Sequence, residues 1–234
     1  MISTTNINHV MPHDRAYRLK ALGLSPAKLD RLLGLGWVRP ADHADAASLT
    51  EIFNQTALSG RNSPTDSHST LAEMECLIQQ QIDTDWPIWV CISHQSVVAF
   101  MLLRPFSWNP RNCCETAELA IYIDAAWQGI GLAPELTTLA FVLAEQKACH
   151  NVAIWVLAKN QASLKFTRKI FSEWAHLPSL ASSAGELCDV YVLGTQLAQW
   201  FASPPGRRAR CHQMEAAAQL STADTTDRSP TLFV

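Results

Sequence analysis

The pattern of apolar and polar positions predicts a chain in which helices and strands alternate. Two segments after Pro40 repeat their apolar residues every three to four positions, which indicates helices with one buried face. The first, capped by Asp42, would bury Ala46, Leu49, Phe53 and Thr56. The second would bury Leu71, Met74, Ile78 and Ile82. Between them, the polar residues 59–69 predict a loop.

Short apolar runs predict the strands. Residues 88–93 and 97–104 are separated by three polar residues, the length of a hairpin connection, so we expect them to pair antiparallel. Further strands are predicted at 37–40, 116–123, 152–157 and 189–193. Two more helices are predicted, one after Gly131 with Leu136, Leu139, Ala140 and Leu143 as its stripe, and one from Asn160 to about Ser172. This order of elements predicts a mixed α/β (α+β) fold.

The two ends differ in composition from the centre, which predicts one domain over residues 37–202. Residues 1–36 are polar and then carry a serine cap, a proline and a glycine stop around 25–34, which predicts an N-terminal helical extension. Residues 203–234 hold too few large apolar side chains to pack a core, so we expect a mostly disordered tail. Its arginines at 207–210 could bind an acidic partner or be solvated.

Charge and cysteine content exclude several classes of protein. A net charge of −3 gives no electrostatic reason to expect nucleic acid as a partner. Seven cysteines without a CxxC pair predict neither a disulfide framework nor a zinc site, and the only His pair at helical spacing, His9 and His13, is interrupted by Pro12, so no metal is expected. No signal segment and no run of eighteen apolar residues is present. We therefore expect a cytoplasmic protein that does not span a membrane.

The stretch from Glu118 to Ala133 carries the strongest chemical signal. A strand pattern runs into a turn with Gly129 and Gly131 and then into a helix. Backbone N–H groups at a helix start, together with the helix dipole, attract phosphate. The stretch therefore predicts a cradle for a diphosphate, although a tight helix entry alone would need the same glycines.

Four patterns, in order along the chain, are similar to those of one enzyme superfamily. They are Glu118 four residues before Tyr122, the loop 128–133 (Gln-Gly-Ile-Gly-Leu-Ala), Asn160 three residues before Ser163 with Phe166 and Ile170 following, and Gly185 before Cys188-Asp189-Val190. From Trp37 to about Leu197 the sequence resembles the GNAT superfamily of acyl-CoA N-acyltransferases, and within it the phosphinothricin acetyltransferase-like branch. The resemblance implies the GNAT fold, a central mixed, mostly antiparallel twisted sheet with a splayed parallel strand pair, flanked by helices.

The same resemblance implies acetyl-CoA as cosubstrate. The backbone of Ile121, Tyr122 and Ile123 would bind its pantetheine arm, and the amides of the following loop would hold its diphosphate. The implied cofactor contacts in that loop and the next helix are Gln128, Gly129, Ile130, Gly131, Leu132, Ala133, Asn160, Ser163 and Phe166. Asn160 is equally well explained as a plain helix cap.

For catalysis, the resemblance implies Glu118 as the base that takes the proton of the amine. Tyr122 would share its face of the strand and could contact the substrate or simply fill the core. Two positions depart from the branch. Cys188 stands where the branch has His, and Thr167 stands where a titratable general acid is usual, and neither side chain can simply replace an imidazole.

The implied acceptor is a small amine, with an amino acid or an analogue as one option. Trp108 and Arg111, in the loop before the strand at 116–123, are the candidates for binding it, Arg111 through a carboxylate, although a solvent-facing loop cation explains Arg111 as well. Two other functions stay open: an acyl-CoA-binding or protein-interaction module with little catalysis, and a protein lysine acetyltransferase. The first 36 residues could cover the substrate mouth or form a dimer contact, so a homodimer stays open as well.

Overall fold

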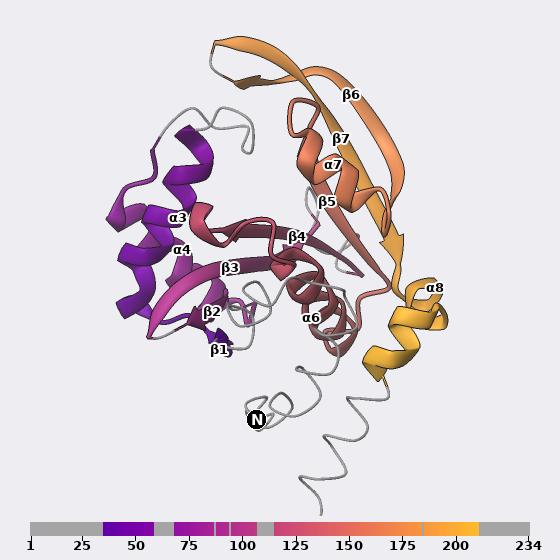
Figure 1. The fold of residues 1–234 in the computed structure, drawn as a ribbon, viewed down its shortest axis with the longest axis horizontal. Helices are drawn as coiled ribbons and strands as arrows, with labels where there is room; N and C mark the ends of the chain where they lie inside the picture. Colours follow the sequence, from indigo (N-terminus) through magenta and orange to yellow (C-terminus); the bar gives the residue numbers. More distant parts are fainter. Residues whose placement is uncertain are drawn as a thin grey trace, which may run out of the picture.

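The computed structural model describes residues 35–58, 68–86, 88–93, 95–106, 115–183 and 185–210. It confirms a mixed fold built on one sheet of seven strands in the order β1-β2-β3-β4-β5-β7-β6. The strands are β1 (Leu35–Pro40), β2 (Trp89–Ser93), β3 (Ser96–Pro105), β4 (Thr116–Ile123), β5 (Asn151–Leu157), β6 (Ser172–Ser183) and β7 (Glu186–Gln196). Neighbouring strands are antiparallel except for β4 and β5. Figure 1 shows β6 and β7 as a long hairpin that extends beyond the rest of the sheet.

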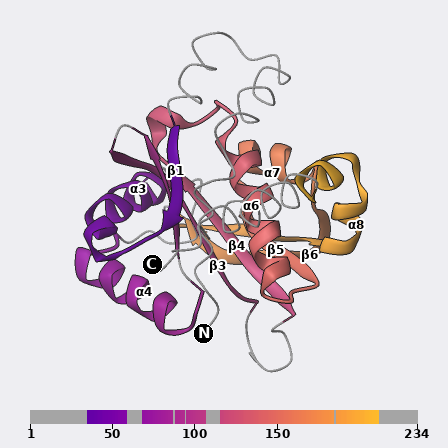
Figure 2. The ribbon, with the colours of Figure 1, turned by 90° about the horizontal axis from the view of Figure 1, so that it is seen from below.

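Helices cover both faces of this sheet. The longer ones are α3 (Ala46–Leu58), α4 (Leu71–Asp83) and α6 (Leu132–Gln146), and the shorter ones are η2 (His43–Asp45), η3 (Ala125–Trp127), α7 (Gln161–Thr167) and α8 (Leu197–Ala202). In Figure 2, α3 and α4 lie on one side of the sheet, and α6 and α7 lie on the other. Because strand side chains alternate between faces, the strands β2, β3 and β4 contribute to a core on each side.

Two hydrophobic cores result. Under α3 and α4, Leu49, Met74 and Ile78 pack against Val90 and Phe100 of the sheet. Under α6 a larger core gathers side chains from β3, β4, β5 and β7, among them Met101, Leu119, Phe141, Val152 and Leu193. The helices predicted at 46–56 and after Gly131 are therefore confirmed as amphipathic core helices.

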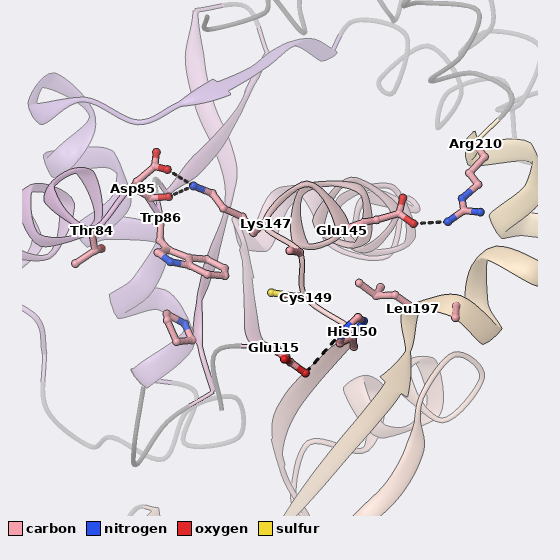
Figure 3. A pocket seen from close by; sticks show the side chains of 13 residues that line it. Thr84, Asp85, Trp86, Glu115, Glu145, Lys147, Cys149, His150, Leu197 and Arg210 are labelled. Atoms are coloured by element: carbon pink, nitrogen blue, oxygen red, sulfur yellow. Dashed lines mark hydrogen bonds and ion pairs between the residues drawn. The ribbon is translucent and has the colours of Figure 1, made fainter. Parts of the chain in front are cut away.

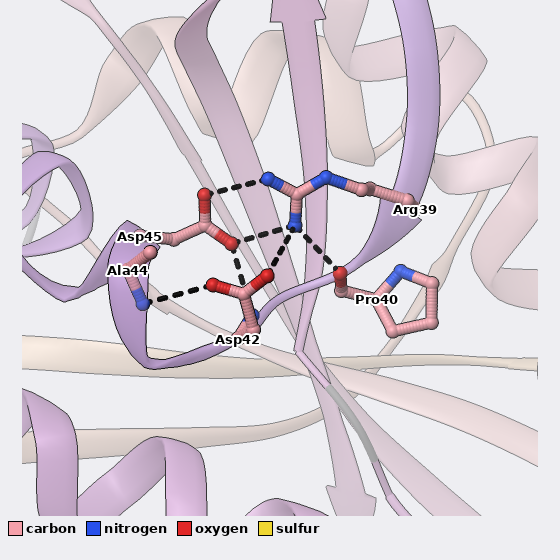
Figure 4. A network of polar contacts seen from close by, with 5 residues as sticks. All are labelled: Arg39, Pro40, Asp42, Ala44 and Asp45. Atoms are coloured by element: carbon pink, nitrogen blue, oxygen red, sulfur yellow. Dashed lines mark hydrogen bonds and ion pairs between the residues drawn. The ribbon is translucent and has the colours of Figure 1, made fainter.

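A charged network fixes the entry to α3 (Figure 4). The two terminal guanidinium nitrogens of Arg39, on β1, bond both carboxylate oxygens of Asp45 at 2.7 and 2.8 Å. Asp45 also accepts the backbone N–H of Asp42, whose own carboxylate caps Ala44. The side chain of Asp45 is buried, and its negative charge is balanced by the Arg39 guanidinium. This ion pair joins the first strand to the start of the first helix.

Several boundaries differ from the sequence expectations. The helix after Asn160 ends at Thr167, and residues 172–183, for which no strand was predicted, form the edge strand β6. Pro178 interrupts its pattern, and the pairing with β7 shifts between Leu177 and Ala181, so no clean two-residue period is visible. On α4, Leu71 and Ile82 at the ends of the predicted stripe are exposed.

The first residues of the predicted tail are helical. Residues 204–210 continue the chain after α8 as a helix. Ala209 is buried, Arg210 lies over the ring of Phe201, and its guanidinium pairs with Glu145 of α6. This segment therefore packs through the small buried Ala209 and the two contacts of Arg210, without the large apolar residues whose absence led us to predict disorder. Residues 211–234 lie outside the described part, as does the predicted extension up to residue 34.

Candidate functional site

The parallel strands β4 and β5 separate along the sheet. They pair only at Thr116–Asn151, Ala117–Val152 and Glu118–Ala153, although β4 runs on to Ile123 and β5 to Leu157. From residue 119 onward, the edge of β4 that faces β5 therefore has no strand partner. Glu118 occupies the last paired position, at the base of this splay. The splayed pair implied by the resemblance is confirmed.

The turn after β4 leads into α6 through two left-handed glycines. Gly129 has φ +72° and Gly131, the N-cap of α6, has φ +99°. Ile130, between the two glycines, and Leu132, after the second, are buried and hold the turn against the core. Whereas Asn160 caps α7 through its side chain, no side chain caps α6. The first amides of α6 have no partner within the helix and meet the requirement for an anion site.

The turn is held in place by polar contacts on both sides. The side-chain amide of Gln128 donates to the carbonyl of Ile123 at 3.0 Å. Gln55 of α3 donates to Asp124 at 3.0 Å and accepts the N–H of Ala125 at 3.0 Å. Gln128 thus supports the turn through its own contact with β4, and the sequence analysis did not identify Gln55, whose partner is 69 residues away. Only the packing of α3 beside the turn brings Gln55 to this contact.

Asn160, Ser163 and Phe166 lie on α7, on the same side of the sheet as α6. The side chain of Asn160 accepts the N–H of Ser163 at 3.0 Å, so it is a helix cap in this structure. Phe166 is half-buried. Their implied contacts with acetyl-CoA remain predictions.

Glu118 faces the side of the sheet that carries α3 and α4, and its partner there is Arg104. The two residues are directly opposite each other on β3 and β4, and Arg104 Nη2 lies 2.6 Å from Glu118 Oε1. The Glu118 side chain is 12% exposed and the Arg104 side chain 49% exposed. The sequence analysis missed Arg104, because only the register of β3 with β4 brings the two charges together.

Tyr122 lies on the same face but deeper in the core. Its ring stacks on Phe100 at 4.7 Å and contacts Phe53 at 5.2 Å between ring centroids. Burial raises the pKa of the Tyr122 phenol, so the hydroxyl keeps its proton at neutral pH. The contacts favour the core interpretation over a role in substrate binding.

Three aromatic side chains lie on the same face of the sheet as Glu118. Phe106, just after β3, stacks on Trp155 of β5 with ring centroids 6.0 Å apart. Because β4 lies between β3 and β5, this pair spans β4 close to Glu118. Trp174 lies over Gly194, so a Cβ at Gly194 would clash with its indole ring. Gly194 pairs with Ala153, which in turn pairs with Glu118 across β4 and β5. Trp155 is 39% exposed and Trp174 45% exposed.

The two doubtful catalytic candidates do not join this site. Cys188 is buried in a small cluster with Leu157, Ala181 and Val190. It is six residues along β7 from Gly194, which corresponds to roughly 20 Å of extended strand. Thr167 is buried, and its hydroxyl donates to the carbonyl of Ser163 at 2.8 Å. Neither geometry provides a general acid or a partner for Glu118.

Asp189, which follows Cys188 in the partial motif, has a structural role. It accepts the N–H of Ser179 at 2.9 Å and lies 2.7 Å from His176 Nε2. Ser179 has φ +52° within the irregular part of β6. These contacts lower the pKa of the Asp189 carboxyl, the backbone hydrogen bond having the larger effect. Trp108 and Arg111 lie outside the described residues, so their assignment to the substrate stays a prediction.

The structure also has a hollow of about 750 Å³ at the opposite end of α6 (Figure 3). Helix α6 has fifteen residues and is roughly 22 Å long, so this hollow is remote from the glycine turn. Its charged residues already pair, Lys147 with Asp85 and Arg210 with Glu145. His150 Nε2 lies 3.8 Å from Glu115. With its charges paired, the hollow has no surplus charge to attract a diphosphate.

The described residues offer neither a metal centre nor a membrane-spanning helix. Within the described ranges, no group of three His, Cys, Asp or Glu side chains could hold a metal ion. Cys76, Cys91, Cys149 and Cys188 are free thiols. Among the helices that the structure describes, none is long and apolar enough to cross a bilayer.

Comparisons with known proteins agree with this geometry. The family model for the acetyltransferase (GNAT) domain matches residues 37–170, more than half of the chain. A Bacillus subtilis protein provisionally named as a phosphinothricin acetyltransferase, YwnH, is 27% identical over 68% of this chain and 98% of its own length. The L-methionine sulfoximine/L-methionine sulfone acetyltransferase of Salmonella typhimurium is 25% identical over 68% of this chain and 94% of its own.

A solved structure shares the fold. YncA from Salmonella typhimurium, provisionally named as an acetyltransferase and determined with acetyl-CoA, superimposes with a TM-score of 0.65 at 22% identity. The match covers 70% of this chain and 94% of that one. The splayed strands, the glycine turn and the family match together lead to one conclusion: the chain belongs to the GNAT family of N-acetyltransferases, with relatives in its phosphinothricin acetyltransferase-like branch.

Proposed function

We propose that this chain transfers the acetyl group of acetyl-CoA to the amine of a small molecule, with Glu118 as general base. The observation that carries the proposal is the position of Glu118 at the last paired residue of β4 and β5, where the two strands begin to separate. A cofactor arm lying between the strands would end beside this carboxylate.

The residues of the splay and the turn fit acetyl-CoA. The unpaired edge of β4 offers the backbone of Ile121–Ile123 to a pantetheine arm, and the uncapped start of α6 offers amides to the diphosphate. Nothing lies within 4 Å of the position that a Cβ on Gly129 would take, so a ligand can approach the backbone there. When bound, acetyl-CoA supplies the activated acetyl group.

Glu118 has the geometry of a base. One of its oxygens bonds Arg104, and no hydrogen bond to the other is present among the described residues. That second oxygen can accept a proton from an incoming ammonium group and so produce the neutral amine that attacks. Proton transfer of this kind contributes typically about 10²- to 10⁴-fold to the rate.

The relatives indicate the class of amine. The names of the Bacillus and Salmonella relatives refer to phosphinothricin, methionine sulfoximine and methionine sulfone, all of which are amino-acid analogues. We infer that this chain also acetylates an amino acid or an analogue.

A thiol-release assay tests this function. The purified chain is mixed with acetyl-CoA and methionine sulfone, methionine sulfoximine, phosphinothricin, a polyamine or a lysine-containing peptide, and free CoA is measured. We expect release with the amino-acid analogues. The Glu118→Gln variant should lose at least tenfold in kcat while binding acetyl-CoA normally, because only the base is removed. Glu75→Gln, an exposed change on α4, is the matched control.

Unchanged turnover in Glu118→Gln would reject Glu118 as the base. The second candidate function is an acyl-CoA-binding module with little catalysis, and the engagement of Thr167 with the carbonyl of Ser163 is the observation that favours it. Such a module would bind acetyl-CoA and release no CoA with any amine. Labelling of the peptide alone would instead support a lysine acetyltransferase.

A further inference from the structure

The pair of Arg104 and Glu118 offers two opposite charges side by side on the substrate face. Their ion pair of 2.6 Å joins neighbouring strands at directly opposed positions, so the backbone of the sheet holds both ends of the pair. The sequence analysis considered Arg111 for a substrate carboxylate, but the structure places a different arginine beside the base.

Arg104 has unused hydrogen-bonding capacity. A guanidinium carries five N–H donors, and among the described residues the only acceptor that Arg104 bonds is Glu118, through Nη2. Half of its side chain is exposed, whereas that of Glu118 is mostly covered. The remaining donors are therefore open to solvent, where the carboxylate of a substrate can reach them.

The surroundings strengthen such an interaction. The Phe106–Trp155 stack spans β4 near this pair and covers part of this face with aromatic surface. Electrostatic interactions gain strength where water is excluded. A bidentate contact from an arginine to a carboxylate is also among the stronger hydrogen-bonded pairs in proteins.

The spacing of the charges matches an α-amino acid. In such a molecule the amine nitrogen and the carboxylate carbon are bonded to one carbon, which places them about 2.5 Å apart. An amine bonded to the second oxygen of Glu118 would leave its carboxylate within reach of the Arg104 guanidinium, and the four charges would then alternate in sign. An amine without a neighbouring carboxylate leaves these donors of Arg104 unused.

We propose that Arg104 is a specificity-determining residue that binds the α-carboxylate of the acceptor while Glu118 takes the proton of its α-amine. The proposal rests on the proposed acetyl transfer to an amine. It assigns the selection of α-amino acids to an arginine on β3, next to the base.

The test compares two acceptors that differ only in the carboxylate, methionine sulfone and 3-(methylsulfonyl)propylamine. For methionine sulfone, Arg104→Gln should lower kcat/KM by about 10- to 100-fold, mainly through KM, because a charge-assisted contact is lost. For the amine, the same change should alter kcat/KM by less than about threefold. Arg104→Lys keeps the charge and should keep part of the preference. Arg210→Gln, a half-exposed arginine paired with Glu145 of α6, is the control.

Each possible outcome supports or overturns the role of Arg104. An equal loss for both acceptors, through kcat, would mean that Arg104 only orients Glu118 and would overturn the proposal, as would a wild-type chain that prefers the amine. Acetyl-CoA affinity, measured on every variant, identifies a variant that fails to fold, in which case Arg104→Lys decides the question. If the wild-type chain releases no CoA with any amine in the panel, the proposed function itself fails, which is a separate result.

Discussion

At the scale of single residues, the proposed cradle for the diphosphate needs glycine because its backbone adopts the left-handed region. Gly129 and Gly185 make a natural comparison, because they have φ +72° and +75° and a Cβ on either would meet nothing within 4 Å. One lies in the turn before α6 and the other in the β6–β7 hairpin. Alanine at either position forces a side chain into the left-handed region, which costs roughly 1 kcal/mol.

This pair yields a prediction about acetyl-CoA. Gly129→Ala and Gly185→Ala should lose similar stability, but only Gly129→Ala should weaken acetyl-CoA binding, by about tenfold, since a methyl group would enter the space from which the diphosphate approaches. Isothermal titration calorimetry with acetyl-CoA and thermal unfolding measure the two effects. Equal affinities in both variants would place the diphosphate elsewhere.

Asp189 gives a prediction about pH. Its hydrogen bonds with Ser179 and His176 lower the carboxyl pKa in the folded chain, whereas in the unfolded chain it is about 3.9. The stabilisation is therefore complete above pH 4 and is lost as pH falls below it toward the folded value. Asp189→Asn should be less stable than wild type at pH 7, and the difference should shrink below pH 4 in urea titrations. A difference that stays constant down to pH 2 would contradict this.

At the scale of elements, the network of Arg39 and Asp45 ties β1 to the start of α3. Asp45→Asn removes the charge that the guanidinium bonds with two contacts, and we expect the free energy of unfolding to fall by about 2 kcal/mol. Chemical denaturation measures it. Glu51→Gln, an exposed change on α3, should stay within about 0.5 kcal/mol of wild type. A comparably small loss for Asp45→Asn would show that the network adds little.

Helices and strands with clean periods were predictable, and irregular ones were not. The hairpin of β2 and β3 and the strand β4 are short apolar runs, and the helix α6 has an apolar stripe; these local patterns predicted them, and they are confirmed. Strand β6 contains Pro178 and a bulge. A hydrogen bond from the Ser179 N–H to Asp189, on the neighbouring strand, holds this irregular part in place. Nothing within residues 172–183 signals that support.

At the scale of the whole molecule, the site forms where the sheet opens. The candidate cofactor residues from the end of β4 into α6 could be proposed from the sequence because they form one continuous stretch whose glycines and helix start have a local physical meaning. The face of the sheet around Glu118 was not predictable. It joins Arg104, Glu118, Trp155 and Trp174 from four strands, and each depends on which residues are paired across the sheet.

The sequence by itself determined the identity of most elements, the glycine turn that begins α6 and the candidate base, because these follow from spacing within a few residues. Only the tertiary structure decided that Arg104 faces Glu118, that Phe106 and Trp155 stack across β4, and that Cys188 lies well away from the base. Strand register sets these relations. It depends on partners 14 to 49 residues apart, whose pairing local periodicity does not encode.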